Sequence, residues 1–221
     1  RPGAAAVDAA TEWARIQAVV QAAVRWNLPI SIDTCKPEVM RAALDAGADI
    51  INDIWALRWP GAAQVVAEHG QCGVCLMHMH AEPATMQVNP MEGLVFEPVR
   101  DFLQLQAQRW QALGVDGARI VLDPGIGFGK TVAQNFELLA RQSELLALGH
   151  GLLVGWSRKS SLGAITGLGL EQRLAPSLAA ATLAMERGAR VLRVHDVAQT
   201  VAAVKVWQAA RPPTPTQPQA A

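Results

Sequence analysis

Short apolar segments of this 221-residue chain end at polar or charged side chains that could do chemistry. In chain order the end residues are Asp33, Asn52, His78, Asp123, Ser157 and the pair Arg193 and His195. Patterns typical of helices separate the segments, and strands that alternate with helices build a parallel sheet. Because binding and catalytic groups in parallel α/β folds collect at the carboxyl ends of the strands, the repetition predicts a fold and a site together.

Three of these end residues, Asp33, Asn52 and Asp123, carry oxygen acceptors. Each one alone is most simply explained as a cap for a helix or a turn. Three acceptors at corresponding ends of different strands are harder to explain as caps, and together they would form the floor of a pocket. Such a floor suits a neutral heterocycle that presents several N–H donors, such as an aminopyrimidinone.

Cationic and hydroxyl side chains follow the last two predicted strands. Residues 157–160 read Ser-Arg-Lys-Ser and come directly after one strand. Arg193 and His195 are expected on one face of the next strand, because strand side chains alternate. This composition predicts a phosphate or pyrophosphate site, which barrel enzymes often hold after their last two strands. A solvated basic surface is the alternative, and Lys159 alone could form a Schiff base.

The glycine-rich segment 125–131 fits neither of the common phosphate-binding motifs. A P-loop would need glycine at the position of Pro124, and a dinucleotide fingerprint would need glycine in place of Lys130. The glycines more simply let the backbone turn sharply or pass close to a ligand. The sequence therefore argues against an ATP or NAD site in this segment.

Cys72 and Cys75 form a C-x-x-C pair, and His78 and His80 follow at a spacing of two. A zinc site is conceivable from these residue types. The cysteine pair, however, enters an apolar strand, whereas activated redox thiols lie at helix N-termini. Buried packing cysteines are the favoured interpretation.

Hydrophobic periodicity predicts the elements that must position these groups. Strands are expected at residues 28–33, 49–54, 73–78, 119–123, 151–156 and 189–196. Helices are expected at about residues 5–26, 37–46, 61–69, 94–113 and 171–187, after an N-cap at Thr131, and as a last helix that ends near Ala209.

Six strand–helix units after a leading helix predict a TIM (β/α)8 barrel, of which about six of the eight βα units lie in this chain. The alternative is a six-stranded open doubly wound sheet. The barrel is favoured because every strand end carries a polar group, whereas an open sheet concentrates its site at one switch point. Residues 1–210 are expected to form a single, N-terminally incomplete barrel domain. The Pro/Gln-rich tail, 211–221, is expected to be disordered.

Composition narrows the class of protein. The 19 basic and 19 acidic residues cancel, which removes electrostatic support for nonspecific binding to nucleic acid or membranes. No apolar stretch reaches the roughly 18–20 residues that span a bilayer. Three cysteines are too few for a disulfide framework and indicate a reducing compartment, so a cytoplasmic protein is expected.

The chain resembles the dihydropteroate synthase family of pterin-binding enzymes in six strings that occur in the same order. They are SIDTCKPEV, INDI, CLMHM, LDPGIGFGK, VGWSRKS and RVHD. The likeness covers residues 1–208, and six such strings in this order are too specific to arise by chance. The opening Arg1-Pro2-Gly3 is similar to the end of that family's GESTRPG loop.

The resemblance implies a (β/α)8 barrel, usually a homodimer, and a transferase of folate biosynthesis that is the target of sulfonamides. The implied reaction moves the 7,8-dihydropterin-6-ylmethyl group from its pyrophosphate ester to 4-aminobenzoate, with Mg²⁺ as cofactor. Its products are 7,8-dihydropteroate and pyrophosphate.

The resemblance also implies roles for residues that match the family's motifs. The residues implied to bind or line the pterin are Asp33, Asn52, Asp123, Phe128, Gly155 and Lys159. Arg193 would stack on the pterin ring and hold pyrophosphate together with His195. The residues implied to border the aminobenzoate site are Ser157, Arg158 and Pro2, and Arg1 is implied to bind substrate from the flexible loop. The implied catalytic groups are Asp33, Lys159, Arg193 and His195.

The family's metal-binding Asn belongs to a first strand that would lie upstream of Arg1, so no metal ligand is expected in this chain. One alternative to the enzyme is a pterin-binding protein that lacks this first strand and does not convert its substrate to product. A pterin-dependent methyltransferase of the same barrel type is another, although the strings SRK and RVHD argue against it. A further alternative is an aldolase of another barrel family, in which Lys159 would form a Schiff base with a carbonyl substrate.

Overall fold

All six strands that the structure describes run parallel and pair in the order of the sequence. The computed structural model describes residues 7–83 and 85–211. The strands are β1 (Ser31–Asp33), β2 (Ile50–Asp53), β3 (Gly73–Met77), β4 (Ile120–Asp123), β5 (Gly151–Val154) and β6 (Ala189–Leu192). Each lies inside a predicted strand, but β6 ends at Leu192 rather than at Asp196. Arg1, Pro2 and almost all of the predicted tail fall outside the described residues.

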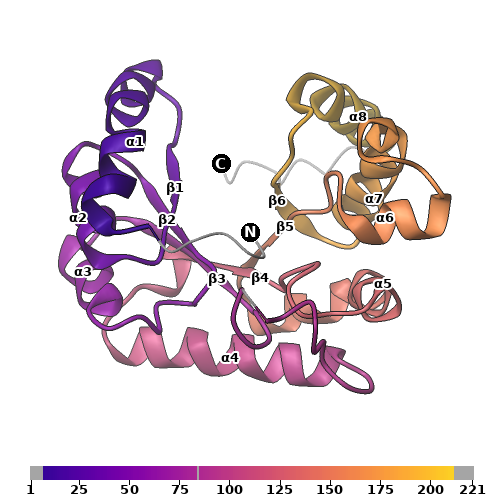
Figure 1. The fold of residues 1–221 in the computed structure, drawn as a ribbon, viewed down its shortest axis with the longest axis horizontal. Helices are drawn as coiled ribbons and strands as arrows, with labels where there is room; N and C mark the ends of the chain where they lie inside the picture. The colour runs from indigo at the N-terminus through magenta and orange to yellow at the C-terminus, as the bar shows by residue number, and fades with distance from the viewer. Residues whose placement is uncertain (1–6, 84, 212–221) are drawn as a thin grey trace, which may run out of the picture.

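Helices line the outer face of the sheet, which curls around an open concave side (Figure 1). They are α1 (Ala9–Ala23), α2 (Pro37–Asp45), α3 (Ala62–His69), α4 (Phe96–Ala112), α5 (Val132–Ala140), α6 (Ser160–Thr166), α7 (Leu174–Glu186) and α8 (Val197–Ala209). Short 3₁₀ helices span Val24–Trp26, Gly117–Arg119, Gln142–Leu148 and Leu170–Gln172. Among the described residues, no helix is both long and apolar enough to cross a membrane.

Strand order and curl decide between the barrel and the doubly wound sheet. The order β1 to β6 contains no reversal, so the sheet has no switch point of the doubly wound kind. The curl also turns the two edges of the sheet toward each other, so that the long side chain of Arg193, just after β6, reaches across and places Nη2 2.7 Å from Asp33 Oδ2 at the end of β1. The predicted barrel class is confirmed, with six parallel strands in a curled part-barrel.

The core lies between the sheet and its helices, and strand alternation produces it. Ile51, Leu76 and Leu122 face outward from neighbouring strands and have no exposed surface. Val121 and Leu153 alternate with such residues and are only partly buried. The apolar outer face therefore holds the fold together, while the concave face stays accessible.

Helix boundaries follow the predicted start and stop signals in several places. Pro37 is the first residue of α2, and Gly47 adopts a left-handed φ of 101° just beyond its end. Thr131 caps α5 through a reciprocal pair of hydrogen bonds with Gln134. Helix α6 was not predicted, because its seven residues, which end at Thr166 before Gly167, are too few to show a helical period.

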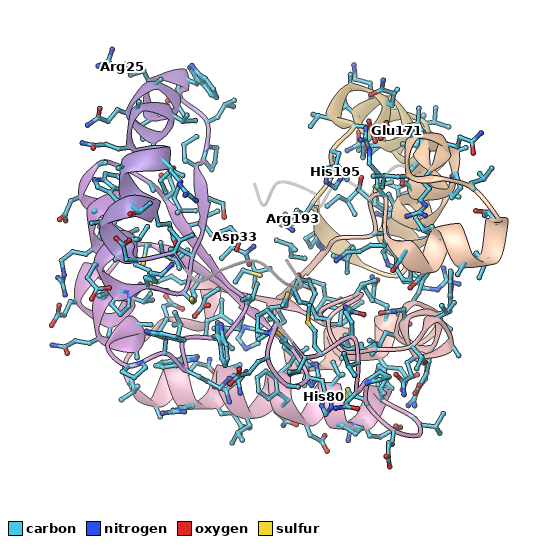
Figure 2. All side chains as sticks on the ribbon, in the orientation of Figure 1. Arg25, Asp33, His80, Glu171, Arg193 and His195 are labelled. Carbon is cyan, nitrogen blue, oxygen red and sulfur yellow. The ribbon has the colours of Figure 1, made fainter. Side chains whose placement is uncertain are left out.

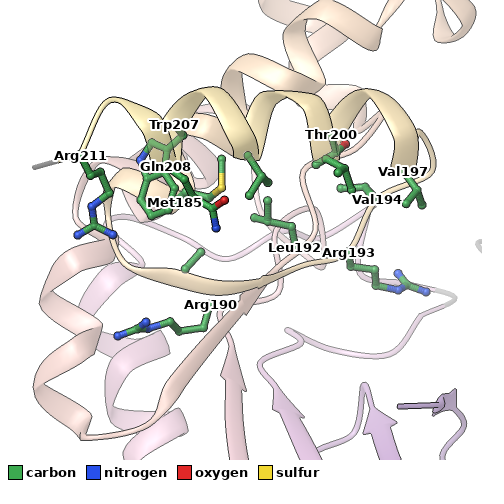
Figure 3. Close-up of a pocket in the computed structure, with 13 residues that line it drawn as sticks. Met185, Arg190, Leu192, Arg193, Val194, Val197, Thr200, Trp207, Gln208 and Arg211 are labelled. Atoms are coloured by element: carbon green, nitrogen blue, oxygen red, sulfur yellow. The ribbon is translucent and has the colours of Figure 1, made fainter. Parts of the chain in front are cut away.

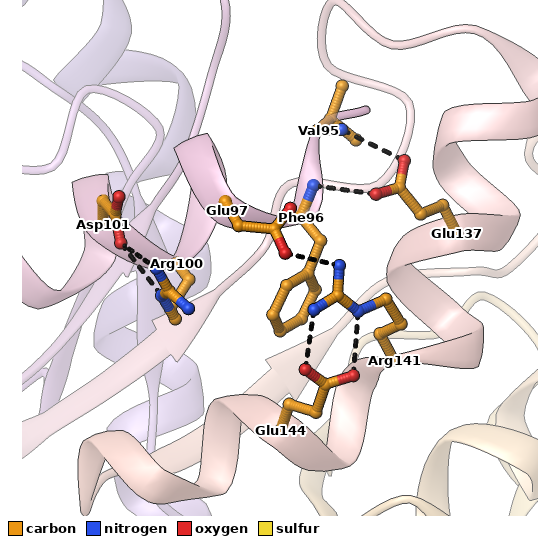
Figure 4. A network of polar contacts seen from close by, with 8 residues as sticks. All are labelled: Val95, Phe96, Glu97, Arg100, Asp101, Glu137, Arg141 and Glu144. Carbon is orange, nitrogen blue, oxygen red and sulfur yellow. Dashed lines mark hydrogen bonds and ion pairs between the residues drawn. The ribbon is translucent and has the colours of Figure 1, made fainter. Parts of the chain in front are cut away.

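Glu137 of α5 caps the N-terminus of α4 from outside that helix (Figure 4). Its carboxylate oxygens accept hydrogen bonds from the backbone N–H groups of Val95 (3.0 Å) and Phe96 (3.1 Å). Arg141, one turn further along, lies 3.9 Å above the Phe96 ring and donates to Glu97 at 2.7 Å. These contacts fix α5, and with it the glycine-rich loop that precedes α5, against α4.

A groove of about 1140 Å³, lined by both apolar and basic side chains, runs along the free edge of the sheet, between β6 and α8 (Figure 3). Its side chains include Met185, Leu192, Val197, Val201, Val204 and Trp207. Of the site residues that the sequence predicts, only Arg193 reaches its lining. The groove is therefore a feature of the sheet edge and is not the place where the predicted site residues gather.

Replacing Glu137 with alanine should lower the free energy of unfolding by about 1–2 kcal/mol, because it leaves two N–H groups of α4 without their acceptors. Urea unfolding followed by circular dichroism measures this change. Glu144→Ala is the matched control, since its exposed ion pair with Arg141 should contribute under about 0.5 kcal/mol. Equal losses in the two variants would contradict the capping role.

Candidate active site at the carboxyl ends of the strands

Strand register places the predicted acceptor residues on the concave side of the sheet. Asp33 pairs with Asn52 across β1 and β2, Asn52 pairs with Cys75 across β2 and β3, and Asp123 pairs with Met77, two residues beyond Cys75, across β3 and β4. Parallel partners at one register position project to the same face, and neighbours such as Ile51 project outward into the core. The three acceptors thus share the floor that the sequence predicts.

Asn52 carries a buried oxygen that no described residue satisfies. Its side chain is only 7% exposed, and its Oδ1 atom has no hydrogen-bond partner among the described residues. A buried oxygen without a donor costs on the order of 1–3 kcal/mol, so native structures rarely leave one unpaired. An N–H group of a bound molecule would satisfy this atom.

Asp123 is buried beside two lysines. Its Oδ1 accepts a hydrogen bond of 2.7 Å from the Gly125 N–H, which fixes the carboxyl against the start of the glycine-rich loop. Burial raises the pKa of Asp123 to about 6, although the Gly125 hydrogen bond, Lys159 and Lys130 lower it. The group is therefore mostly ionised at pH 7, an acceptor held out of water.

Lys159 lies across the glycine-rich loop and approaches the acceptor floor. Its Nζ atom sits 4.5 Å from the centre of the Phe128 ring, and a Cβ atom on Gly127 would come within 3.3 Å of that nitrogen. Burial lowers the pKa of Lys159, Asp123 raises it, and Arg193 lowers it. The ammonium is thus a donor placed close to the Asp123 carboxylate without a direct ion pair in the described residues.

Asp33 and Arg193 face one another across the concave side (Figure 2). Both side chains are open to water, at 45% for Asp33 and 58% for Arg193, so the pair is weak and can separate at little cost. The crowded strand ends still desolvate the carboxyl, which raises the pKa of Asp33 while Arg193 opposes the shift.

The predicted cluster of cations is divided among separate partners. Arg158 donates to Asp196, with Nη2 at 2.7 Å from Oδ1 and Nε at 3.2 Å from Oδ2. The His195 N–H donates to Ser157 Oγ at 3.2 Å, and the His195 ring nitrogen Nδ1 lies 2.9 Å from the same oxygen. Arg158 and Ser157 are therefore engaged within the protein.

The expectation that Arg193 and His195 share one strand face is wrong, because β6 ends at Leu192 and both residues lie in the loop before α8. Alternation does not hold outside a strand. Arg193 turns toward Asp33, and His195 turns toward Ser157. Gly155 lies beside Arg193, since a Cβ atom there would be 3.7 Å from Arg193 Cβ.

Two buried groups at the site carry little sequence signal. Asp53 has no exposed surface and accepts hydrogen bonds from the N–H groups of Trp55 and Leu57, which holds the turn after β2. Burial raises the pKa of Asp53 to about 6 against those two hydrogen bonds. Lys130, 5% exposed, lies under the glycine-rich loop with its Nζ 3.0 Å from His78 Nδ1. The lysine after the glycines was visible in the sequence, but its burial was not.

Metal ligands are not gathered in the described residues, which contain no group of three or more His, Cys, Asp or Glu side chains placed to hold an ion. Cys72 and Cys75 are free and buried, as packing cysteines were expected to be. The zinc interpretation gains no support from their surroundings. The donor set also does not fit a magnesium site by itself.

A family model described as pterin binding enzyme matches residues 1–195 of the chain. The chain belongs to the pterin binding enzyme family. Its curated relatives include the dihydropteroate synthase of Escherichia coli (strain K12), 46% identical over 210 residues that make up 95% of this chain and 74% of the relative. The dihydropteroate synthase of Neisseria meningitidis serogroup B is 42% identical over 214 residues, 95% of this chain and 75% of the relative.

Solved structures of dihydropteroate synthases share the fold of this pterin binding enzyme. That of Yersinia pestis, in a sulfonamide drug complex, has a TM-score of 0.91 and 42% identity over 95% of this chain and 76% of its own. The structure from Xanthomonas albilineans, with 4-aminobenzoic acid, has a TM-score of 0.89 and 48% identity, and the match covers 96% of this chain and 77% of that chain. The structure from Burkholderia cenocepacia, complexed with 7,8-dihydropteroate, has a TM-score of 0.86 and 47% identity, and the match covers 95% of this chain and 77% of that chain.

Asp123→Asn should raise the free energy of unfolding of this pterin binding enzyme at pH 8 by roughly 1–3 kcal/mol relative to the parent protein. At pH 4 the variant should be no more stable than the parent. The folded pKa of about 6 exceeds the unfolded value of about 3.9, so the protonated carboxyl stabilises the fold below pH 4, and that contribution is lost as the pH rises through 6. Asparagine stays neutral throughout and keeps an oxygen for the Gly125 N–H.

Urea unfolding at pH 4 and pH 8 measures this difference, with Asp101→Asn as the control because that carboxylate is exposed. A variant less stable than the parent at pH 8 would show that the Asp123 charge supports the fold.

Proposed function

We propose that the chain is a dihydropteroate synthase. It transfers the 7,8-dihydropterin-6-ylmethyl group from its pyrophosphate ester to 4-aminobenzoate and yields 7,8-dihydropteroate and pyrophosphate, a step of folate biosynthesis. The observation that carries the proposal is the unpaired, buried Oδ1 of Asn52, on the same floor as the ionised Asp123. Family membership and the ligands named for the solved relatives support it.

The pterin would lie on the acceptor floor. Asn52 Oδ1 and the Asp123 carboxylate would accept its N–H groups, and the Lys159 ammonium would donate to its ring oxygen or nitrogen. Phe128 and Gly155 would line the pocket, because the Phe128 ring already lies under Lys159 and Gly155 leaves room beside Arg193. This donor and acceptor pattern matches a neutral aminopyrimidinone edge.

The transfer breaks the bond between the pterin methylene carbon and the pyrophosphate oxygen, and the electron pair leaves with pyrophosphate. Arg193 and His195 would hold that anion, and Arg193 would stack on the ring after it leaves the exposed pair with Asp33. Asp33 would then stabilise the positive charge on the methylene. The amine nitrogen of 4-aminobenzoate would form the new bond and lose its proton to water. Ser157 and Arg158 would border this substrate, and the resemblance implies the same region for Arg1 and Pro2, which lie outside the described residues.

Mg²⁺ would enter with the pyrophosphate ester as part of the substrate. The described residues offer it no ready cluster of ligands, and Mg²⁺ commonly binds through substrate phosphates with few protein ligands. A cytoplasmic location also belongs to the proposal, since Cys35, Cys72 and Cys75 are all free thiols.

The protein would act as a homodimer through its last three α-helices. Ile165 of α6, Leu183 of α7 and Val206 of α8 are exposed at 58%, 45% and 71%, outside the groove at the sheet edge. The three helices contact one another in the order α6, α7, α8, and exposed apolar side chains on neighbouring helices are typical of an association surface. Val206→Glu should shift the sedimenting species from dimer to monomer, whereas Val88→Glu, equally exposed in the loop after β3, should not. A parent protein that sediments as a monomer would contradict this part of the proposal.

Turnover of the two substrates tests the reaction. The protein, mixed with the pterin pyrophosphate, 4-aminobenzoate and Mg²⁺, should release pyrophosphate and form 7,8-dihydropteroate, measured by a coupled phosphate assay and mass spectrometry. Pterin binding without product would contradict the transferase and support a pterin-binding protein that does not catalyse the reaction. The absence of pterin binding in isothermal titration would overturn the proposal.

Lys159→Ala and Asp123→Asn should each weaken pterin binding by about 2–4 kcal/mol, the scale of a buried hydrogen bond to a charged group. Lys205→Ala on the exposed face of α8 is the matched control and should change nothing. Calorimetric dissociation constants that equal the parent's would remove these two residues from the site.

A further inference from the structure

The Lys130 ammonium is buried beneath the glycine-rich loop and is surrounded by loop acceptors. Its Nζ donates to the carbonyl oxygens of Gly125 (2.9 Å) and Phe128 (3.1 Å) and to the unprotonated Nδ1 of His78 (3.0 Å). The His78 ring is itself held edge-on against Phe102, with ring centres 5.0 Å apart. Three donors on one nitrogen thus tie both ends of the loop to the end of β3.

The ionisation of this cluster follows from its burial. Burial, followed by the charge of Lys130, lowers the pKa of His78 to about 3, so the imidazole is neutral and accepts the lysine hydrogen bond. Burial lowers the pKa of Lys130 to about 7, Asp123 opposes that shift and Lys159 adds to it. A lysine kept at such a cost in desolvation needs the acceptors that the loop provides.

Asn135 of α5 anchors the same loop from its other side. Its Oδ1 accepts from the Gly127 N–H at 2.7 Å, and its Nδ2 donates to Lys130 O, Thr131 O and Ser161 Oγ at 3.3, 2.9 and 3.0 Å. Asn135 is 1% exposed. The loop is therefore held by two buried polar side chains, neither of which lies on the acceptor floor.

The loop held in this way carries the surfaces between which Lys159 lies. Gly127 adopts a left-handed φ of 80° and lies against the Lys159 side chain. Phe128 places its ring under the Lys159 ammonium. Gly125 has no room for a side chain, because a Cβ atom would clash with the His78 carbonyl oxygen. A loop released from Lys130 would no longer fix Phe128 or the path of Lys159.

We propose that Lys130 is a positioning residue for the pterin subsite. It acts through the glycine-rich loop, which it locks in the shape that sets Phe128, Gly127 and Lys159 around the pterin, and it does not touch the substrate. The proposal rests on the proposed function and adds a residue to it. Asn135 serves the same purpose from the opposite side of the loop.

The test compares the two substrates in the full chain. Lys130→Ala should weaken pterin binding 10- to 100-fold by isothermal titration and raise the KM for the pterin pyrophosphate, while the KM for 4-aminobenzoate stays within twofold of the parent's. Ethylammonium ions should restore pterin binding in this variant at least in part, because they can occupy the cavity that the lysine leaves. Lys205→Ala, the surface control, should match the parent in every measurement.

Asn135→Ala provides a second route if Lys130→Ala does not fold, and it should give the same split between the two substrates. Near-ultraviolet circular dichroism and melting temperature establish that each variant is folded. Pterin affinity unchanged in a folded variant, or equal losses for both substrates, would overturn the role of Lys130. A parent protein that binds no pterin would instead overturn the proposed function, so the two failures are distinguishable.

Discussion

Polar groups held out of water at the carboxyl ends of a parallel sheet are the constraint on which the rest of this structure depends. Asp123, Asp53 and Lys130 are each buried, and burial moves the pKa of each toward its neutral form. Backbone groups offset that cost, through Gly125 for Asp123 and through Trp55 and Leu57 for Asp53. The loops after the strands consequently take their shapes from the charges they enclose.

Four buried side-chain atoms have no hydrogen-bond partner among the described residues, and the Asn52 oxygen is the one on the acceptor floor, which is why it bears on function. A fold selected for stability alone would give this buried acceptor a donor, yet the described residues offer none. Asp123 is likewise ionised where a neutral group would be more stable. An unpaired acceptor and a buried charge on the same face of the sheet destabilise the free protein, and a ligand with complementary N–H groups recovers part of that energy on binding.

The sequence predicted the strands and the polar residues at their ends well, because both follow from local patterns. Their position at the carboxyl ends of strands placed Asp33, Asn52 and Asp123 on one face of the sheet, and their role in pterin binding stays a prediction. Contacts between segments distant in the chain were beyond such patterns. The pairs of Arg158 with Asp196 and Arg193 with Asp33 depend on how far the sheet curls and where β6 ends. The burial of Lys130 depends on His78, 52 residues away.

A structure determined with 7,8-dihydropteroate bound tests most directly whether the strand ends form the pterin site. The pterin ring should lie on the concave side, with one of its N–H groups within hydrogen-bond distance of Asn52 Oδ1 and another facing the Asp123 carboxylate. A ligand seated in the groove between β6 and α8, with the Asn52 oxygen still unpaired, would contradict the assignment.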